Sequence, residues 1–296
     1  MDSRDRDSNS SLTLAGPKVP EFGLGHDRWL DLVSRYTSMS LTNPSDKLVA
    51  LSGIAKRRVA HTQDDYMAGM WRKNILHHLL WYMRRNVAIR DQNIQGRHAS
   101  YRAPTWSWAS TDHPVEIFPR MALDTCLYQV ADLHLTYATE DTTGPVTSGW
   151  IELRGHLKHT QLIWHEGGGD SNNLDEPCWH MMIDDESNLW YSWINLDNPP
   201  VNKKAFDGDN ANGRLFYMPT AKISTVFNPD AGISLLFRVV DSSLGIFERL
   251  GYGYWSGVRD KQLQYTNAIL ADLGEEVKQS LPCVRYEDGL HTIRVI

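Results

Sequence analysis

The segment Tyr101–Asp112, YRAPTWSWASTD, marks the point at which the hydrophobic periodicity of this 296-residue chain changes. Upstream, apolar residues recur at the three- and four-residue spacing of helices, and downstream they recur at every second position, as in strands. Trp106 and Trp108 are two positions apart, so an extended backbone would place both rings on one face of a strand. Pro104 suits the start of a strand because it has no amide hydrogen to donate. We therefore expect a strand over residues 105–110 that presents a flat aromatic surface with indole N–H donors.

The part of the chain before this segment is expected to form a helical cap over residues 27–100, preceded by a polar, disordered tail over residues 1–26. Asn43 followed by Pro44 is typical of a helix start, with an N-cap residue and then proline at the first helical position. The strongest helix is expected to begin near Thr62 and to run for about six turns. Its apolar face would contain Met67, Met70, Trp71, Ile75, His78, Leu79 and Tyr82.

The part after Tyr101 is expected to be rich in antiparallel strands separated by turn segments. A short helix is expected over residues 260–271. The predicted strands are 105–110, 114–118, 125–138, 149–164, 178–184, 188–195, 214–227, 231–240, 244–254 and 290–296. The predicted fold class is α+β, with the N-terminal helical cap packed on a strand-rich antiparallel β-barrel or sandwich over residues 101–296. Residues 27–296 would form either one compact unit or two tightly docked domains.

Composition and charge exclude several classes of function. A net charge of −6 and a pI of about 6.0 argue against nucleic-acid binding, which needs a clustered basic face. The three cysteines, Cys126, Cys178 and Cys283, are far apart and form no C-x-x-C pair, which favours buried thiols in a reducing compartment. Residues 1–11 are too polar for a signal peptide, and no apolar run reaches the roughly 18 residues of a membrane span. We therefore expect a cytoplasmic protein.

Motifs for cofactors and metals are weak in this sequence. Gly251–Gly257 has its third glycine misplaced by one position for a dinucleotide-binding loop. His156 and His159 lie on one predicted strand with His165, but their odd spacing turns them to opposite faces. No metal site and no cofactor are therefore expected.

The region around Tyr101 resembles a known family. Residues 101–115 are similar to the signature YRAPSWSWASVDGPV, which lies downstream of the conserved domain in fungal heterokaryon-incompatibility (HET) proteins. The HET domain itself, with its LSYCWG-like block, should precede this region, and no segment of residues 1–26 resembles it. The chain thus resembles the C-terminal region of HET proteins without the HET domain. Other segments that follow the order of the family are 29–85, 149–155, 215–219, 232–238 and 247–251.

The signature segment supplies the candidate site residues. Asp112 matches the turn of the family signature, whereas His113 replaces its usual glycine and adds an imidazole beside the aromatic residues. In the functional interpretation, Arg102, Asp112 and His113 are catalytic, with His113 or Arg102 polarising a conjugated carbonyl. The substrate-binding residues would be Tyr101, Trp106 and Trp108, with Trp71 and Trp81 on the opposite wall. In the structural interpretation, the same motif packs the helical cap against the sheet.

Two functions remain open at this stage. The first is a cofactor-independent enzyme of fungal specialised metabolism, a cyclase or pericyclase of the Diels–Alderase kind or an isomerase. It would hold an apolar polyene or terpenoid substrate in an aromatic pocket. The alternative is a non-enzymatic protein-interaction module, or a truncated HET protein related to self/non-self recognition, that binds a protein partner. An enclosed apolar cavity would favour the enzyme, and an exposed flat aromatic patch would favour the module.

Overall fold

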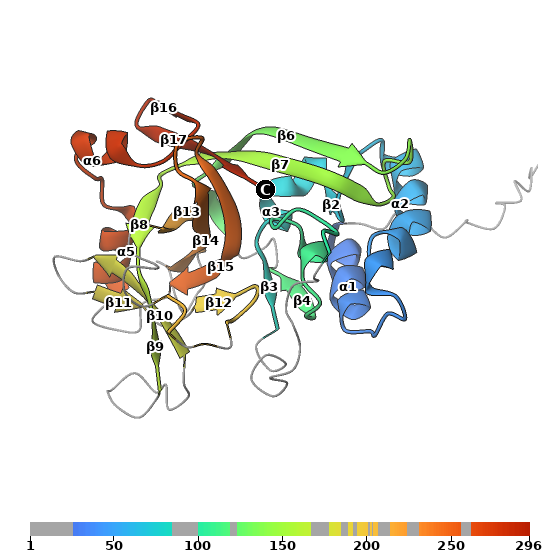
Figure 1. Cartoon of the computed structure of the whole chain (residues 1–296), viewed down its shortest axis with the longest axis horizontal. Helices are drawn as coiled ribbons and strands as arrows, with labels where there is room; N and C mark the ends of the chain where they lie inside the picture. Colours follow the sequence, from blue (N-terminus) through green and yellow to red (C-terminus); the bar gives the residue numbers. More distant parts are fainter. Residues whose placement is uncertain are drawn as a thin grey trace, which may run out of the picture.

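The computed structural model confirms an α+β fold in which helices cover one end of a large, mainly antiparallel sheet (Figure 1). The predicted N-terminal tail, except for His26, lies outside the described residues. The structure describes residues 26–84, 100–118, 123–166, 178–184, 189–191, 194–200, 202, 204–206, 214–223, 231–255 and 262–296. No helix among these residues has the length and apolar character required to cross a membrane.

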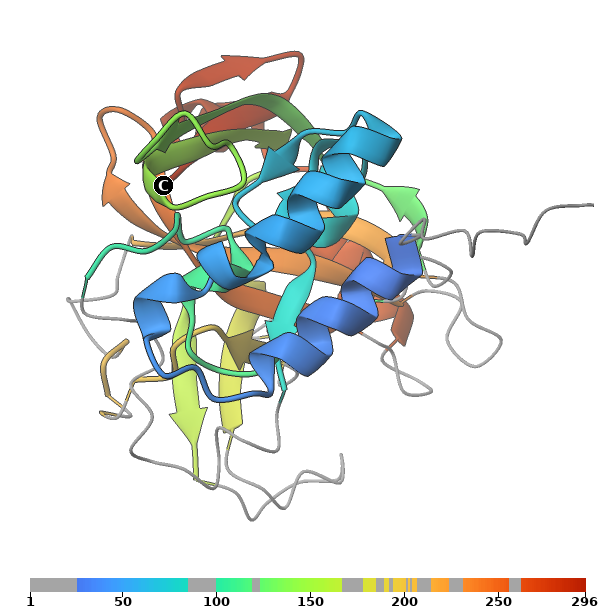
Figure 2. The same cartoon turned by 90° about the vertical axis from the view of Figure 1, so that its right-hand side faces the viewer.

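The N-terminal helices are α1 (His26–Thr37), the 3₁₀ turn η1 (Pro44–Asp46) and α2 (Val49–Thr62), and Figure 2 shows α1 and α2 on the same side of the molecule. The predicted start at Asn43 is confirmed, because its side chain accepts a hydrogen bond of 3.2 Å from the amide of Ser45. Figure 1 places these helices at one end of the molecule and, near the other, the small sheet formed by β9 (Leu162–His165), β10 (Cys178–Asp184) and β11 (Leu189–Tyr191).

The six-turn helix predicted from Thr62 is wrong. Thr62 ends α2, and Gln63 caps it in the left-handed conformation with φ of 51°. A hairpin follows, formed by β1 (Tyr66–Met67) and β2 (Met70–Trp71), and then the chain makes short elements. These are η2 (Arg72–Asn74), α3 (Ile75–His78) and β3 (Trp81–Met83).

The turn of this hairpin explains why the helix does not form. Gly69 has a φ of +96°, which L side chains rarely adopt, and the adjacent Ala68 has a φ of 47°. A Cβ atom at Gly69 would lie 2.7 Å from the indole of Trp108. The apolar residues have helical spacing, but no helix forms because the indole of Trp108 packs directly against the backbone of Gly69.

The strand predicted over residues 105–110 is also wrong. This segment forms a turn followed by the 3₁₀ turn η3 (Trp108–Ser110). The Ser107 hydroxyl accepts a hydrogen bond of 3.0 Å from the amide of Ala109 and donates one of 2.6 Å to the carbonyl of Ala68. Because a serine side chain can replace strand partners in this way, the segment turns, and the two indoles are not displayed on one strand face.

The large sheet has the hydrogen-bonded order β5-β13-β14-β15-β17-β7-β6, with β12, β8 and β16 attached to β15, β13 and β17. Its pairs are antiparallel except β15 with β17. A three-stranded sheet has the order β11-β10-β9, and β3 pairs with β4. The bounds are β4 Val115–Ile117, β5 Leu123–Cys126, β6 Gln129–Tyr137, β7 Val146–Gly155, β8 Lys158–Thr160, β9 Leu162–His165, β10 Cys178–Asp184, β11 Leu189–Tyr191, β12 Ile194–Leu196, β13 Leu215–Ile223, β14 Ala231–Asp241, β15 Ile246–Trp255, β16 Arg285–Glu287 and β17 Leu290–Val295.

The predicted strands other than 105–110 correspond to strands of the structure, although three of them are divided. Residues 125–138 contain the end of β5 and all of β6, residues 149–164 contain parts of three strands, and residues 188–195 contain β11 and the start of β12. Residues 224–227 of the predicted strand 214–227 lie outside the described residues. The predicted helix over 260–271 corresponds to α5 (Gln262–Leu270), and α6 (Glu275–Ser280) was not predicted. One core cluster joins the cap to the large sheet, and a second lies around the small sheet.

Candidate functional site

The signature tryptophans lie inside the core. Trp106 and Trp108 are at most 1% exposed. The indole N–H of Trp108 donates a hydrogen bond of 2.9 Å to the carbonyl of Gly69, and the N–H of Trp29 donates one of 3.1 Å to the same atom. The ring of Trp108 is therefore fixed between α1, the β1–β2 hairpin and the signature segment, as the structural interpretation of the motif requires.

The two residues predicted for the opposite wall are also buried, and Trp81 contacts the signature segment. The indole of Trp81 donates a hydrogen bond of 2.8 Å to the carbonyl of Trp106. Trp71 packs edge-on against Trp29, with ring centroids 5.1 Å apart, and both Trp71 and Trp81 have no exposed surface. Tyr101 differs from all of them because 53% of its surface is exposed. The predicted aromatic residues thus form a packed core together with one exposed tyrosine.

Arg102 is a buried cross-link. Its Nε donates to the carbonyl of Ala109 at 2.6 Å, and its Nη2 donates to the carbonyl of Thr111 at 3.0 Å. Its Nη1 donates to the carbonyl of Pro44 at 3.0 Å and to a carboxylate oxygen of Asp112 at 2.6 Å. All three guanidinium nitrogens thus have acceptors within the protein, and they tie the signature segment to the start of η1.

Sequence reasoning missed Lys47, which completes this group. Its ammonium donates to the same Thr111 carbonyl that Arg102 uses. Burial, and then the nearby Arg102, lower the pKa of Lys47 to about 7, whereas Asp112 opposes that shift. Burial also lowers the pKa of His113, which is 3% exposed. We call Lys47, Arg102, Asp112 and His113 the Arg102 cluster.

A second buried cation was also missed. Arg249 on β15 forms a buried ion pair with Asp197, with Nε 3.0 Å from the carboxylate oxygen Oδ2. Its Nη1 and Nη2 donate to the carbonyls of Leu79 at 2.9 Å and Trp81 at 2.5 Å. The Thr111 hydroxyl donates to the Asp197 carbonyl at 3.3 Å, which links this pair to the Arg102 cluster. The signal in the sequence was the alternation of this strand, which places Arg249 on the same face as the apolar Phe247.

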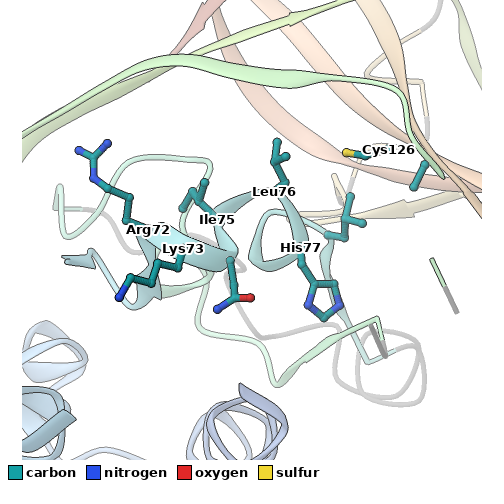
Figure 3. Close-up of a pocket in the computed structure, with 9 residues that line it drawn as sticks. Arg72, Lys73, Ile75, Leu76, His77 and Cys126 are labelled. Atoms are coloured by element: carbon teal, nitrogen blue, oxygen red, sulfur yellow. The ribbon is translucent and has the colours of Figure 1, made fainter. Parts of the chain in front are cut away.

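The structure contains a partly open cavity of about 350 Å³ between the η2–α3 segment and the β5–β13 edge of the large sheet (Figure 3). A volume of this size is at the lower end for small-molecule sites. The nine described residues around it include none of the eight predicted site residues. They are Arg72, Lys73, Asn74, Ile75, Leu76, His77, Leu80, Cys126 and Ala221.

Contacts from the sheet fix the backbone of the segment that lines this cavity. The two carbonyls held by Arg249 belong to Leu79 and Trp81, which flank the lining residue Leu80. The Tyr128 hydroxyl, near the start of β6, donates a hydrogen bond of 2.5 Å to the carbonyl of Leu76. The cavity wall is therefore held in place by buried groups from β15 and from the residue that precedes β6.

The polar end of the cavity has two cations. The Arg72 guanidinium forms an ion pair of 3.0 Å with Asp65, and both side chains are more than half exposed. The Lys73 ammonium donates a hydrogen bond of 3.0 Å to the carbonyl of Thr62. His77 adds an imidazole whose Nε2 contacts the carbonyl of Phe118. The cavity thus combines aliphatic walls with hydrogen-bond donors, which is the combination that orients a small molecule.

The histidines considered for a metal site are not on one strand. His159 lies on β8, and His165 lies on β9, where its ring stacks on His180 of β10 at 5.0 Å. Within the described part of the chain, no group of three or more His, Cys, Asp or Glu residues could hold a metal ion. The three cysteines are free thiols.

Comparison with known proteins finds no matching family model, curated protein or solved structure for this chain. The similarity to the C-terminal region of HET proteins therefore stays a prediction.

Proposed function

We propose that this chain is a cofactor-independent small-molecule enzyme, a cyclase, pericyclase or isomerase of fungal specialised metabolism, and that its substrate binds in the cavity beside α3. The observation that carries the proposal is the cavity of about 350 Å³ with aliphatic walls and cationic donors at one end. An apolar polyene or terpenoid held there near its reactive shape would react faster because its entropy of orientation is already lost.

The residues that would stabilise developing charge are those that line the cavity. Lys73 and Arg72 can donate hydrogen bonds to a carbonyl oxygen that becomes more negative in the transition state. Arg102, the donor expected from the sequence, already has acceptors for all three nitrogens inside the protein. We therefore assign the donor role to the cavity residues and a packing role to the Arg102 cluster. We also place the enzyme in the cytoplasm, where a thiol such as Cys126 stays reduced.

The alternative, a protein-interaction module that uses the tryptophans as its contact surface, has less support. Trp71, Trp81, Trp106 and Trp108 are at most 1% exposed, so these rings form no surface patch in this conformation. Interface hot spots need side chains that a partner can reach and cover. The criterion set out from the sequence is an enclosed apolar cavity, whereas this cavity is partly open and has polar residues in its lining, so the burial of the tryptophans is the observation that favours the small-molecule enzyme over the module.

The test is a turnover screen with a variant that fills the cavity. Purified protein is incubated with a panel of conjugated polyenes and terpenoids, and each mixture is analysed by chromatography and mass spectrometry. We expect at least one compound to give a product of unchanged mass. Leu76→Trp should abolish this conversion, because the larger ring occupies the cavity.

The matched control is Leu244→Trp, the same change at a residue that is 59% exposed and does not line the cavity. It should convert the substrate at the wild-type rate. Conversion by Leu76→Trp at that same rate would place the chemistry elsewhere, and a panel in which no compound binds contradicts the proposal.

A further inference from the structure

We infer that the substrate of the cavity is an amphipathic anion, a molecule with a carboxylate at one end and an apolar body. This inference rests on the proposed function, because it names the chemical class of the molecule bound at the same site. The carboxylate would lie against Arg72 and Lys73, and the apolar body would lie along Ile75, Leu76 and Leu80.

The charge of the cavity lining supports an anionic ligand. Among its nine described lining residues, two are cations and none is a carboxylate. Arg72 and Lys73 are adjacent in the sequence, and Figure 3 shows both at one end of the lining, away from Leu76 and Cys126. Asp65 pairs with Arg72 at this end, whereas the Lys73 ammonium donates to a neutral carbonyl, so the excess positive charge comes from Lys73 and favours a ligand whose charge is also confined to one end.

The existing partners of the two cations leave room for a ligand. The Arg72–Asp65 pair is exposed on both sides, and exposed ion pairs contribute little to stability. Lys73 donates to the neutral carbonyl of Thr62. A carboxylate ligand would give the ammonium a charged acceptor, and charge-assisted hydrogen bonds are about twice as strong as neutral ones. Arg72 offers the planar, two-pronged geometry that matches a carboxylate.

The uncharged part of the lining has the character required for the apolar body. Ile75 and Leu80 are at most 8% exposed and Ala221 is 1% exposed, and all three belong to the core cluster or pack beside it. An alkyl or polyene chain placed there would leave water and contact these apolar side chains. The two ends together select a molecule with separate charged and apolar parts.

The test uses decanoate and decanol, which have the same chain and differ in the charge of the head group. Isothermal titration calorimetry on the full chain should show that decanoate binds at least about tenfold more tightly than decanol. Lys73→Gln and Arg72→Gln should each weaken decanoate binding about three- to tenfold and leave decanol binding unchanged. Raising the salt concentration should weaken the binding of decanoate only.

The control variant is Lys56→Gln, which removes an exposed lysine paired with Asp141, outside the cavity lining. It should leave both affinities unchanged. The inference is overturned if decanol binds as tightly as decanoate, if neither compound binds, or if Lys73→Gln and Arg72→Gln leave decanoate binding unchanged. None of these results decides the proposed function, because turnover of a neutral polyene that Leu76→Trp abolishes would still support it.

Discussion

The Arg102 cluster and the cavity beside α3 differ in how their charged groups are satisfied. In the cluster, Arg102 is buried and bonds to three carbonyls and one carboxylate of the protein. At the cavity, Arg72 and Lys73 are exposed, and the ammonium of Lys73 contacts a neutral carbonyl. A buried cation whose nitrogens all have acceptors within the protein holds the fold together, whereas an exposed cation beside an apolar wall can bind another molecule.

This difference shows that the residues most conspicuous in the sequence are not the ones most available to bind a ligand. The signature segment is conspicuous because tryptophan, arginine and proline are concentrated there, and the structure uses these residues to join the cap to the sheet. The cavity-lining segment contains no recognisable motif. Variants that disturb the junction should therefore change stability, and variants at the cavity should change binding.

The largest expected effect is that of Arg249→Met. It would leave the Asp197 carboxylate buried without its cation and remove the donors to the carbonyls of Leu79 and Trp81. We expect the free energy of unfolding to fall by about 5 kcal/mol, the upper end for a broken buried pair. Urea unfolding measures it. Arg238→Met breaks an exposed pair with Glu248 and should lower the free energy of unfolding by less than about 1 kcal/mol. Equal losses in the two variants would contradict the contrast between buried and exposed cations.

The second variant separates the packed tryptophans from the exposed tyrosine. Trp108→Ala removes a fully buried ring and the hydrogen bond to Gly69, so it should lower the free energy of unfolding by about 4 kcal/mol. Tyr101→Ala, at a half-exposed position, should change it by less than about 1 kcal/mol. Thermal or urea unfolding of both variants is sufficient. A small effect of Trp108→Ala would restore the interpretation in which this ring lines a binding surface.

The third prediction concerns the pH dependence that Lys47 gives to stability. Its pKa is about 7 in the folded protein and 10.5 in the unfolded chain, so between these values the unfolded state binds more protons. Stability should therefore rise with pH over this range, by roughly 2 kcal/mol from about pH 7 to about pH 9. Lys47→Met should lose this rise. The check is a set of urea unfolding curves for both proteins at several pH values, and parallel pH profiles would contradict the burial of a titrating amine.

The smallest effect on stability is expected at the cavity itself. Lys73→Gln should change the free energy of unfolding by less than about 0.5 kcal/mol, because the side chain is exposed. Its effect on decanoate binding should nevertheless be severalfold. Urea unfolding and titration calorimetry on the same preparation measure the stability and the decanoate affinity of this variant. A loss of stability as large as that of Trp108→Ala would mean that Lys73 belongs to the structural junction.

The fold class and most strands could be predicted because local patterns dominate there. The predicted strand 231–240 nearly matches β14, and Asn43-Pro44 marked the start of η1. The segment after Thr62 could not be predicted, since its apolar spacing fits a helix and the reason it turns is the indole of Trp108 lying against Gly69. That contact joins residues 39 positions apart in the chain.

The cavity could not be predicted from the sequence for a related reason. Its lining joins residues 72–80 to Cys126 on β5 and Ala221 on β13, so no local motif could mark it. The error at the hairpin also placed residues 72–80 within a continuous helix. Trp71 and Trp81 were expected to form a pocket wall opposite the signature residues, and Trp81 does contact Trp106, but the burial of these rings depends on how the cap packs on the sheet.

The most direct test of the central claim, that ligands bind beside α3 and not along the signature, is thiol protection at Cys126. This exposed cysteine lines the cavity, and Cys283, which is partly buried and lies outside the lining, is an internal control. Burial raises the pKa of both thiols, so labelling with N-ethylmaleimide is followed by mass spectrometry at about pH 8.5. Saturating decanoate should slow labelling of Cys126 severalfold and leave Cys283 unchanged. An unchanged rate at Cys126 with decanoate bound would contradict the account.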